Sequence, residues 1–323
     1  MSRRFCFLIA ALLTVTVSSG VCANDAFPNR PIRLIVPSTP GTGTDTIARL
    51  LSAKLKDSAG WIVAVENRPG ASGTLALGET VRAKPDGHEW VIGLSTNVTL
   101  APALMKLTFD PMKDLIAVAY LVDTPLVFLV SQASPHQNWK SFVDAAGKAP
   151  KPVSYGSFGN GSSAHVAGEL LRLEGGPKLQ HVAYKGSSLA LTDLMGGHID
   201  AALSSTGSSL SLLQSGKVRA LAVTSARRSS SLPSVPTFAE LGFTGFNRPE
   251  WYGVFVPSAT PAAVVDRIHD EVNKVLAMPE VRAALVAQGQ EPRVESRKAF
   301  ESMVRADFKA SAEIINKADV KLD

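Results

Sequence analysis

Cysteine is nearly absent from this sequence. The 323 residues contain two cysteines, Cys6 and Cys22, and both lie close to the start of the chain. If that segment is removed as a leader, the remaining chain has no thiol. Disulfide bonds, cysteine nucleophiles and cysteine-bound metals are then excluded.

The start of the chain also lacks a hydrophobic run long enough to span a bilayer. The apolar block at 5–17 is shorter than the roughly 20 residues required, which disfavours a membrane anchor. Two arginines precede the block, and small residues ending at Ala23 follow it. This pattern predicts a secretory signal peptide over 1–23, cleavage after Ala23 and export to the periplasm. A lipoprotein attached through Cys22 is disfavoured, because Gly20 and Val21 are a poor approach to a lipidated cysteine.

Charge of either sign is weakly represented. The formal net charge of +5 falls to +3 when the two leader arginines, Arg3 and Arg4, are removed. The densest basic run, Arg227 and Arg228 with Arg219 upstream, has no aromatic partners and is typical of a solvated surface. We therefore do not expect nucleic acid as a partner.

Short β-branched runs alternate with amphipathic segments from residue 30 onward. The expected strands lie at 32–37, 61–66, 89–94, 126–131, 152–155, 181–184, 199–205, 218–225 and 251–257. The expected helices lie at 44–57, 72–83, 139–147, 163–174, 187–195, 208–215, 261–277 and 297–317. This order predicts mostly parallel α/β sheets with helices on both faces.

Two lobes are expected, because roughly 300 residues exceed what one core usually supports. No low-complexity linker divides them, so we predict that strands 126–131 and 251–257 cross between lobes. Lobe 1 would comprise 24–124 plus 251–323, and lobe 2 would comprise 125–250. Trp251 and Tyr252, at the start of the second crossover strand, are expected to pack in the core or the hinge.

Glycine, serine and threonine gather in the loops that follow the strands and lead into helices. These loops lie at 37–49, 67–78, 95–104, 156–165, 184–193 and 204–213. Doubly wound sheets bind ligands at this edge, and a helix N-terminus stabilises an anion by about 0.3–1 kcal/mol. Acids are almost absent from the loops, with Asp45 and Asp193 as exceptions. We therefore expect an anion-binding cleft without carboxylates and without a general acid/base pair.

The stretch 154–171 matches neither a complete nucleophile motif nor a complete phosphate-binding motif. Tyr155 stands where a Gly-x-Ser-x-Gly elbow needs its first glycine, although a nearby serine could still meet His165. An exported serine hydrolase using Ser157, Ser162 or Ser163 therefore stays as an alternative. The stretch has no phosphate-loop lysine, since Lys185 belongs to another loop. The six histidines are scattered singly, so neither a metal site nor a cofactor is expected.

Several segments together resemble one known family. They are "PGTGTDTIAR", "ENRPGASG", "SYGSFGNGSSAHVAGELL", "VAYKGSSLALTDLMGGHIDAAL", "GKVRALAVTSARRSSSLPSVPTFAELG" and "WYGVFVPSATP". In this order they resemble the Bug-type extracytoplasmic solute receptors of tripartite tricarboxylate transporters. The resemblance implies a monomeric, non-catalytic periplasmic binding protein of the two-lobed Venus-flytrap, type II-like architecture. Such a receptor encloses a small anionic organic ligand, such as a di- or tricarboxylate, an acidic amino acid or an aromatic acid, and passes it to integral-membrane transporter subunits.

The resemblance also implies which residues bind ligand. From the first lobe they are Ser38, Thr39, Gly41, Thr42, Gly43, Thr44, Asp45, Gly70, Ala71, Ser72, Gly73, Ser95, Thr96 and Asn97. From the second lobe they are Ser157, Gly159, Gly161, Ser162, Ser163, His165, Tyr184, Lys185, Gly186, Ser204 and Ser205. For Lys185, a surface charge and a direct ligand contact both remain open.

The sequence departs from the family pattern at three places. Gly43 stands one position later than the family's second glycine, and Ser188-Leu189-Ala190 replaces a frequent Ala-Pro-Ala. Leu203-Ser204 replaces a frequent Phe-Asp, so an acid that could pair with a ligand ammonium is lost. A plain carboxylate is therefore favoured over an amino acid. A membrane sensor in place of the transporter remains open as the downstream partner.

Overall fold

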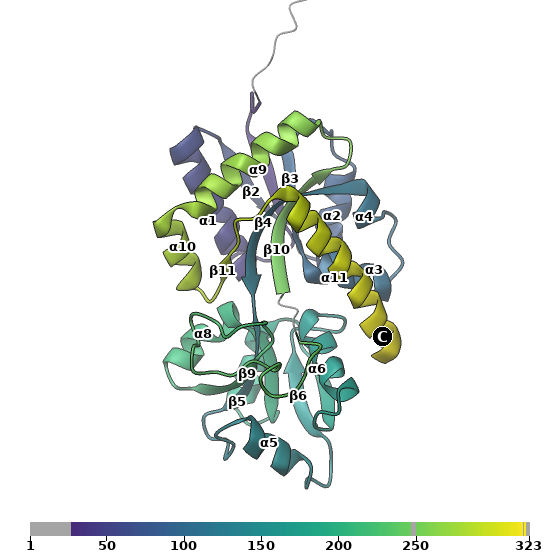
Figure 1. Ribbon diagram of the computed structural model, residues 1–323, viewed down its shortest axis with the longest axis vertical. Coiled ribbons are helices and arrows are strands. Elements are labelled where there is room, and N and C mark those ends of the chain that lie inside the picture. Colours follow the sequence, from purple (N-terminus) through teal and green to yellow (C-terminus); the bar gives the residue numbers. More distant parts are fainter. Residues whose placement is uncertain (1–26, 247–249, 319, 321–323) are drawn as a thin grey trace, which may run out of the picture.

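The computed structural model describes residues 27–246, 250–318 and 320, which form two lobes stacked along the long axis (Figure 1). The predicted signal peptide lies outside the described residues. Among the described residues, no helix combines the length and apolar character that crossing a membrane requires.

The first sheet has the strand order β11-β4-β10-β3-β1-β2. Its strands are β1 (Ile32–Val36), β2 (Val63–Asn67), β3 (Glu89–Leu94), β4 (Leu115–Thr124), β10 (Glu250–Pro257) and β11 (Glu291–Pro292). β1 pairs in parallel with β2 and β3, whereas β10 runs antiparallel to both β3 and β4. The helices α1 (Gly43–Ala59), α2 (Thr74–Val81), α3 (Ala101–Leu104), α4 (Pro111–Asp114), α9 (Ala262–Ala277), α10 (Pro279–Val286) and α11 (Arg297–Ala318) accompany this sheet.

The second sheet has the strand order β7-β6-β8-β5-β9. Its strands are β5 (Leu126–Ser131), β6 (Val153–Ser157), β7 (Leu179–Ala183), β8 (Ala201–Ser205) and β9 (Val218–Val223). β6 pairs in parallel with β7 and β8, and β5 runs antiparallel to β8 and β9. The helices α5 (Trp139–Ala146), α6 (Ser163–Leu173), α7 (Ser187–Met195) and α8 (Thr206–Gln214) belong to this lobe.

The two sheets share one topology. In each, three parallel strands are followed by one antiparallel strand, β10 or β5, and then by β4 or β9; the first sheet adds β11 at its edge. The chain passes from β4 into β5 with only Pro125 between them, and it returns to the first sheet through β10. The predicted two-lobed α/β architecture with crossover strands is thus confirmed.

The C-terminal helices were predicted to pack on the first lobe. α9 does so, because Val265, Ile268 and Val272 are fully buried in that lobe's main core. α11 contacts β4 but also α6 of the second lobe, and in Figure 1 it runs down the first lobe and ends beside the top of the second. At its end, Arg172 donates a hydrogen bond to the carbonyl of Ala318 over 3.3 Å. The last helix therefore spans the lobes.

Candidate functional site

A cleft of about 420 Å³ lies between the lobes, where the strand ends of both sheets meet. Both lobes line it. Predicted binding residues in its wall are Ser38, Thr42, Gly43, Thr44, Gly70, Ser72, Gly73, Thr96, Gly159, Ser162, Lys185, Gly186 and Ser205. All six predicted loops contribute to this wall. The rule that doubly wound sheets bind ligands at their carboxyl strand ends therefore located the cleft from sequence.

The other predicted binding residues lie outside the cleft wall. Thr39, Gly41 and Ala71 are exposed beside it. The remaining residues are buried or partly buried and do not line the cleft, and they are Asp45, Ser95, Asn97, Ser157, Gly161, Ser163, His165, Tyr184 and Ser204. Direct ligand contact by any predicted residue stays a prediction.

Three helices that begin at the cleft are capped by a hydroxyl. Thr42 accepts from the amide of Asp45, Ser162 from that of His165, and Ser205 from that of Ser208. These hydroxyls satisfy one N–H each, and the first-turn amides that remain are available to a ligand.

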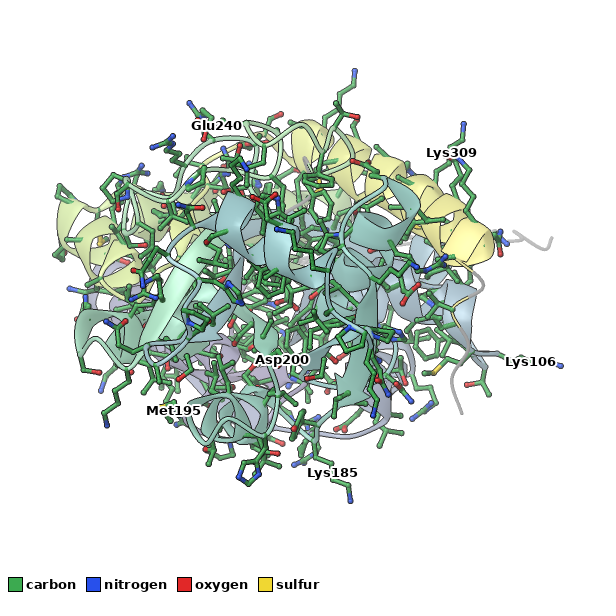
Figure 2. All side chains as sticks on the ribbon, turned by 90° about the horizontal axis from the view of Figure 1, so that it is seen from below. Lys106, Lys185, Met195, Asp200, Glu240 and Lys309 are labelled. Atoms are coloured by element: carbon green, nitrogen blue, oxygen red, sulfur yellow. The ribbon has the colours of Figure 1, made fainter. Side chains whose placement is uncertain are left out.

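The helix α7 begins differently, because its N-cap residue Gly186 has no side chain to accept from the first-turn amides. The same loop carries Lys185, whose exposed side chain projects outward in Figure 2. A free helix N-terminus with a lysine at the cleft mouth is a favourable environment for an anion.

Asp45 organises the first loop. Its carboxylate is buried and accepts from the amide of Gly41 at 2.9 Å, from Arg49 Nε at 2.9 Å and from Asn67 Nδ2 at 3.0 Å. The hydrogen bond from Arg49 is the largest influence that lowers the pKa of Asp45. A carboxylate bound by three donors in this way holds the loop in place, and Asp45 is not among the residues that line the cleft.

The second loop contains backbone conformations that are rare outside glycine. Ala71 and Ser72 adopt φ values of 46° and 53°, and Gly73 follows at 85°. A Cβ atom on Gly73 would lie 2.8 Å from Asn97 Nδ2 and 3.0 Å from Pro37 Cβ, so this glycine allows the loops after β1, β2 and β3 to pack together. Such strain is often concentrated at ligand-binding loops.

Ser157 pairs with a histidine, but not with the predicted one. Its Oγ lies 2.6 Å from His181 Nε2, and the His181 ring stacks on His165 at a centroid distance of 3.8 Å. Burial, and then the neighbouring His165, lower the pKa of His181 to about 4. Ser157 is completely buried and does not line the cleft, so this pair offers no accessible nucleophile to the serine hydrolase alternative.

The prediction of a cleft without carboxylates is wrong. Glu250, the first residue of β10, lines the cleft while its exposed fraction is only 5%. Thr96 Oγ1 donates to its Oε1 over 3.3 Å. Burial raises the pKa of Glu250 to about 7. The sequence analysis missed Glu250 because it considered only the loops that follow strands. Glu250 lies instead at the start of a strand.

Other residues in the cleft wall were also missed. Tyr252, expected in the core or hinge, comes from the crossover strand β10, Thr124 is the last residue of β4, and Gln290 comes from the segment before β11. Gln290 Nε2 donates to the carbonyl of Gly43 over 3.2 Å. Within the described residues, no group of three or more histidines, cysteines and acids is arranged to hold a metal ion.

Comparison with known proteins decides the family. A model described as "Tripartite tricarboxylate transporter family receptor" matches residues 47–320. The chain belongs to this family. Among solved structures it is similar to the periplasmic binding protein BugD, with 31% identity, a TM-score of 0.80 and coverage of 91% of this chain and 99% of BugD. The Bug-type resemblance is thereby confirmed, and the two-lobed receptor fold with it.

Two other similar structures contain carboxylates. Rpa4515 of R. palustris with adipate is 29% identical and has a TM-score of 0.82. The alignment covers 91% of this chain and 99% of the Rpa4515 chain. MatC of Rhodopseudomonas palustris with bound malate is 29% identical and has a TM-score of 0.78. The alignment covers 90% of this chain and 100% of the MatC chain. This receptor family is one of solute-binding proteins.

Proposed function

We propose that this family member is a periplasmic receptor that captures a small organic carboxylate and delivers it to the membrane subunits of a tripartite tricarboxylate-type transporter. Backbone N–H groups and Ser/Thr hydroxyls at opposed helix N-termini bind the ligand. The receptor is exported by a signal peptide cleaved after Ala23 and acts as a monomer, with 24–124 and 251–323 in one lobe and 125–250 in the other.

One observation carries this proposal: helices from both lobes begin at the same cleft. α1 contributes Gly43 from the first lobe, and α6, α7 and α8 contribute Ser162, Gly186 and Ser205 from the second. Each helix end favours an anion by about 0.3–1 kcal/mol, so several acting together contribute a few kcal/mol. A ligand that touches both lobes stabilises the closed arrangement, because it binds that state better than an open one.

The volume and the relatives agree with a small acid as ligand. A cleft of about 420 Å³ falls within the size range of small-molecule sites. Malate is bound to MatC, and adipate accompanies Rpa4515. We extend the carboxylate class from those proteins to this receptor.

The test is a thermal-shift screen of the protein without residues 1–23 against mono-, di- and tricarboxylates, aromatic acids, acidic amino acids and neutral sugars. Saturable stabilisation by carboxylates is expected, because binding to the native state raises the unfolding midpoint. If no acid raises the melting temperature, or if only sugars raise it, the proposal is contradicted.

A matched pair of variants places the binding in the cleft. Ser208→Trp puts a bulky side chain on an exposed residue of α8 that lines the cleft, whereas Ser211→Trp puts it on an exposed residue of the same helix outside the wall. The first should abolish the shift caused by acids, and the second should preserve it. Equal shifts of the melting temperature in both variants would show that the acid binds outside this cleft.

A further inference from the structure

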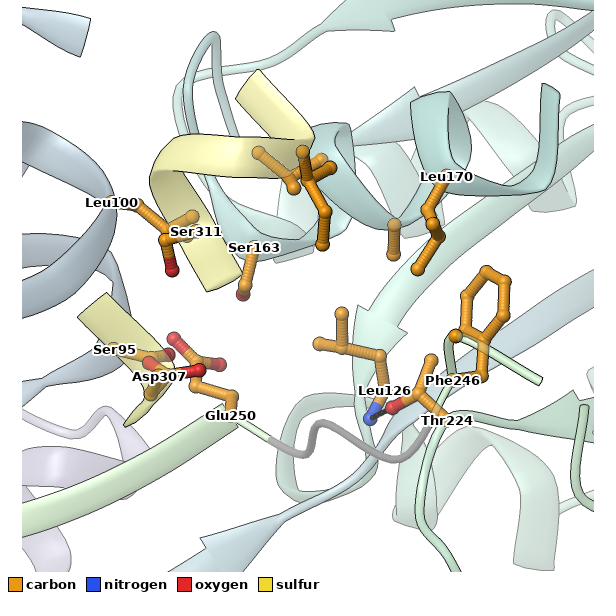
Figure 3. A pocket seen from close by; sticks show the side chains of 14 residues that line it. Ser95, Leu100, Leu126, Ser163, Leu170, Thr224, Phe246, Glu250, Asp307 and Ser311 are labelled. Carbon is orange, nitrogen blue, oxygen red and sulfur yellow. Dashed lines mark hydrogen bonds between the residues drawn. The ribbon is translucent and has the colours of Figure 1, made fainter. Parts of the chain in front are cut away.

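Glu250 lies where two cavities meet. It lines the ligand cleft, and it also lines a smaller cavity of about 50 Å³ behind the cleft, which it shares with Ser95 and Asp307 (Figure 3). The Asp307 carboxylate is occupied at least by Trp251 Nε1, at 3.0 Å, and by Thr99 Oγ1, at 2.5 Å. Glu250 is therefore the acid that faces the ligand.

The Glu250 carboxylate has no ion-pair partner among residues 27–246, 250–318 and 320. Among the described residues, no lysine, arginine or histidine lies within ion-pair distance of it. Its neighbours are hydroxyls. The hydroxyls of Thr96 and Ser163 lie against it, and Thr44, Thr124 and Tyr252 line the cleft as well. The Tyr252 hydroxyl is held neutral, because burial raises its pKa.

The cleft therefore has two chemically different ends. At the helix ends, amides and hydroxyls present hydrogen-bond donors, which suit a carboxylate. At the strand end, Glu250 presents oxygens with about four lone-pair sites, and the hydroxyls of Thr96 and Ser163 supply donors to two of them. An acceptor buried without a partner is unfavourable, so a ligand that brings a donor to this end is favoured over one that does not.

We propose that Glu250 makes this receptor selective for carboxylic acids that carry a hydrogen-bond donor, a hydroxyl or an ammonium group, away from the carboxylate. The inference rests on the proposed function and narrows it. It replaces the preference for a plain carboxylate that followed from the lost acid at Leu203-Ser204. A site built to hydrogen-bond a ligand hydroxyl discriminates strongly against the analogue that lacks it.

The experiment compares acids that share a skeleton and differ in one group. Calorimetry at pH 8, where Glu250 is mostly ionised, measures the Kd of succinate, malate and aspartate; of propionate, lactate and alanine; and of benzoate, 4-hydroxybenzoate and 4-aminobenzoate. The tightest ligand should carry a hydroxyl or amine donor and should bind at least tenfold better than its donor-free partner. The lower Kd of the two, that of the hydroxyl acid or that of the amino acid, identifies the preferred donor.

Two variants assign the preference to Glu250. Glu250→Met removes every acceptor and should reduce the ratio of the two Kd values at least tenfold, while the donor-free acid binds no more weakly than it binds to wild type. Glu250→Gln keeps one neutral acceptor and the side-chain shape, so it should lose preference for an ammonium more than for a hydroxyl. The control is Glu313→Gln, an exposed acid on α11 that lies outside the cleft wall, which should leave the ratio unchanged.

The outcomes separate the two proposals. If acids bind but the donor-free member binds as tightly, or if Glu250→Met keeps the ratio, the selectivity inference is wrong and the receptor function stands. If Glu250→Met fails to fold, as judged by its melting curve, the Glu250→Gln ratio decides by the same criterion. If no acid binds to the wild-type protein, the receptor function fails and the inference fails with it.

Discussion

Glu250 illustrates how one buried acid links protonation to folding. Its pKa is about 7 in the folded protein against an ordinary value of 4.5, so the folded state binds more protons than the unfolded state between these limits. The contribution of this residue to stability is therefore greatest below about pH 4.5 and is lost as the pH rises through 7. The lost free energy is up to about 3 kcal/mol, from about 1.36 kcal/mol for each pKa unit.

The first prediction concerns Glu250→Gln, which cannot ionise. Relative to wild type, this variant should gain melting temperature at pH 8 and gain little at pH 5, because only the ionised form of Glu250 carries the desolvation cost. Thermal unfolding of both proteins without ligand at the two pH values measures the difference. An equal change at pH 5 and pH 8 would contradict the raised pKa.

Asp45 provides a second prediction at the residue scale. Asp45→Ala leaves Arg49, Asn67 and the Gly41 amide without their common acceptor, so we expect a loss of about 2–4 kcal/mol in unfolding free energy. Affinity for the acid should fall too, because the loop before α1 is no longer held in place. Denaturant unfolding and calorimetry measure the two effects. Asp57→Ala, on an exposed face of the same helix, should change neither; comparable losses in both variants would refute the role given to Asp45.

At the scale of elements, the turn that contains Gly73 joins three strand ends. Gly73→Ala adds a Cβ atom that meets Asn97 Nδ2 at 2.8 Å and Pro37 Cβ at 3.0 Å, in a left-handed conformation. Gly60→Ala adds one at a similar φ of 69° but in open space. The second variant should therefore cost about 1 kcal/mol and the first more, with a loss of affinity only in the first. Equal stability and unchanged binding in both would show that the packing at Gly73 is unimportant.

The elements best predicted from sequence are those with strong local signals. The strand at 89–94 and the helix at 187–195 were predicted with the bounds that β3 and α7 have, because turn residues mark both their ends. β4 was not predicted, since residues 115–124 are buried almost throughout and have no alternation that separates a strand from a helix. α10 was missed because Pro279 begins a new helix directly after Met278, where the sequence suggested only the end of α9.

The cleft could be predicted only as far as it is built by local rules. Loops that follow parallel strands reach the same edge of a sheet, and this rule brought residues such as Ser38, Thr96 and Ser162 to the cleft wall. Glu250 and Gln290 come from a crossover strand and a C-terminal segment, whose position depends on how the lobes are joined. No local pattern carries that information.

At the scale of the molecule, one carboxylate bridges the lobes beside the hinge. Glu291 Oε1 accepts from the Ser230 amide at 2.9 Å, from Ser230 Oγ at 2.7 Å and from Ser229 Oγ at 3.2 Å. Glu291 belongs to the first sheet, and the two serines follow β9 of the second. These bonds stabilise the relative position of the lobes in this arrangement.

Glu291→Ala should therefore broaden the distribution of interlobe distances in the ligand-free protein. Without residues 1–23 the chain has no cysteine, so spin labels can be introduced at the exposed Asp57 and Asp144, one in each lobe, and the distances measured by double electron–electron resonance. A saturating acid should narrow the distribution again. A distribution identical to that of the unmutated labelled protein would show that Glu291 does not hold the lobes.

The central claim is that the cleft recognises the negative charge of a carboxylate by helix N-termini of both lobes. Calorimetry with the best-binding acid and with the primary amide of the same skeleton tests it most directly, because the two differ in charge and scarcely in shape. The acid should bind with a Kd near micromolar, which corresponds to about −8 kcal/mol, and the amide at least a hundredfold more weakly. An amide that binds within threefold of its acid would contradict the claim.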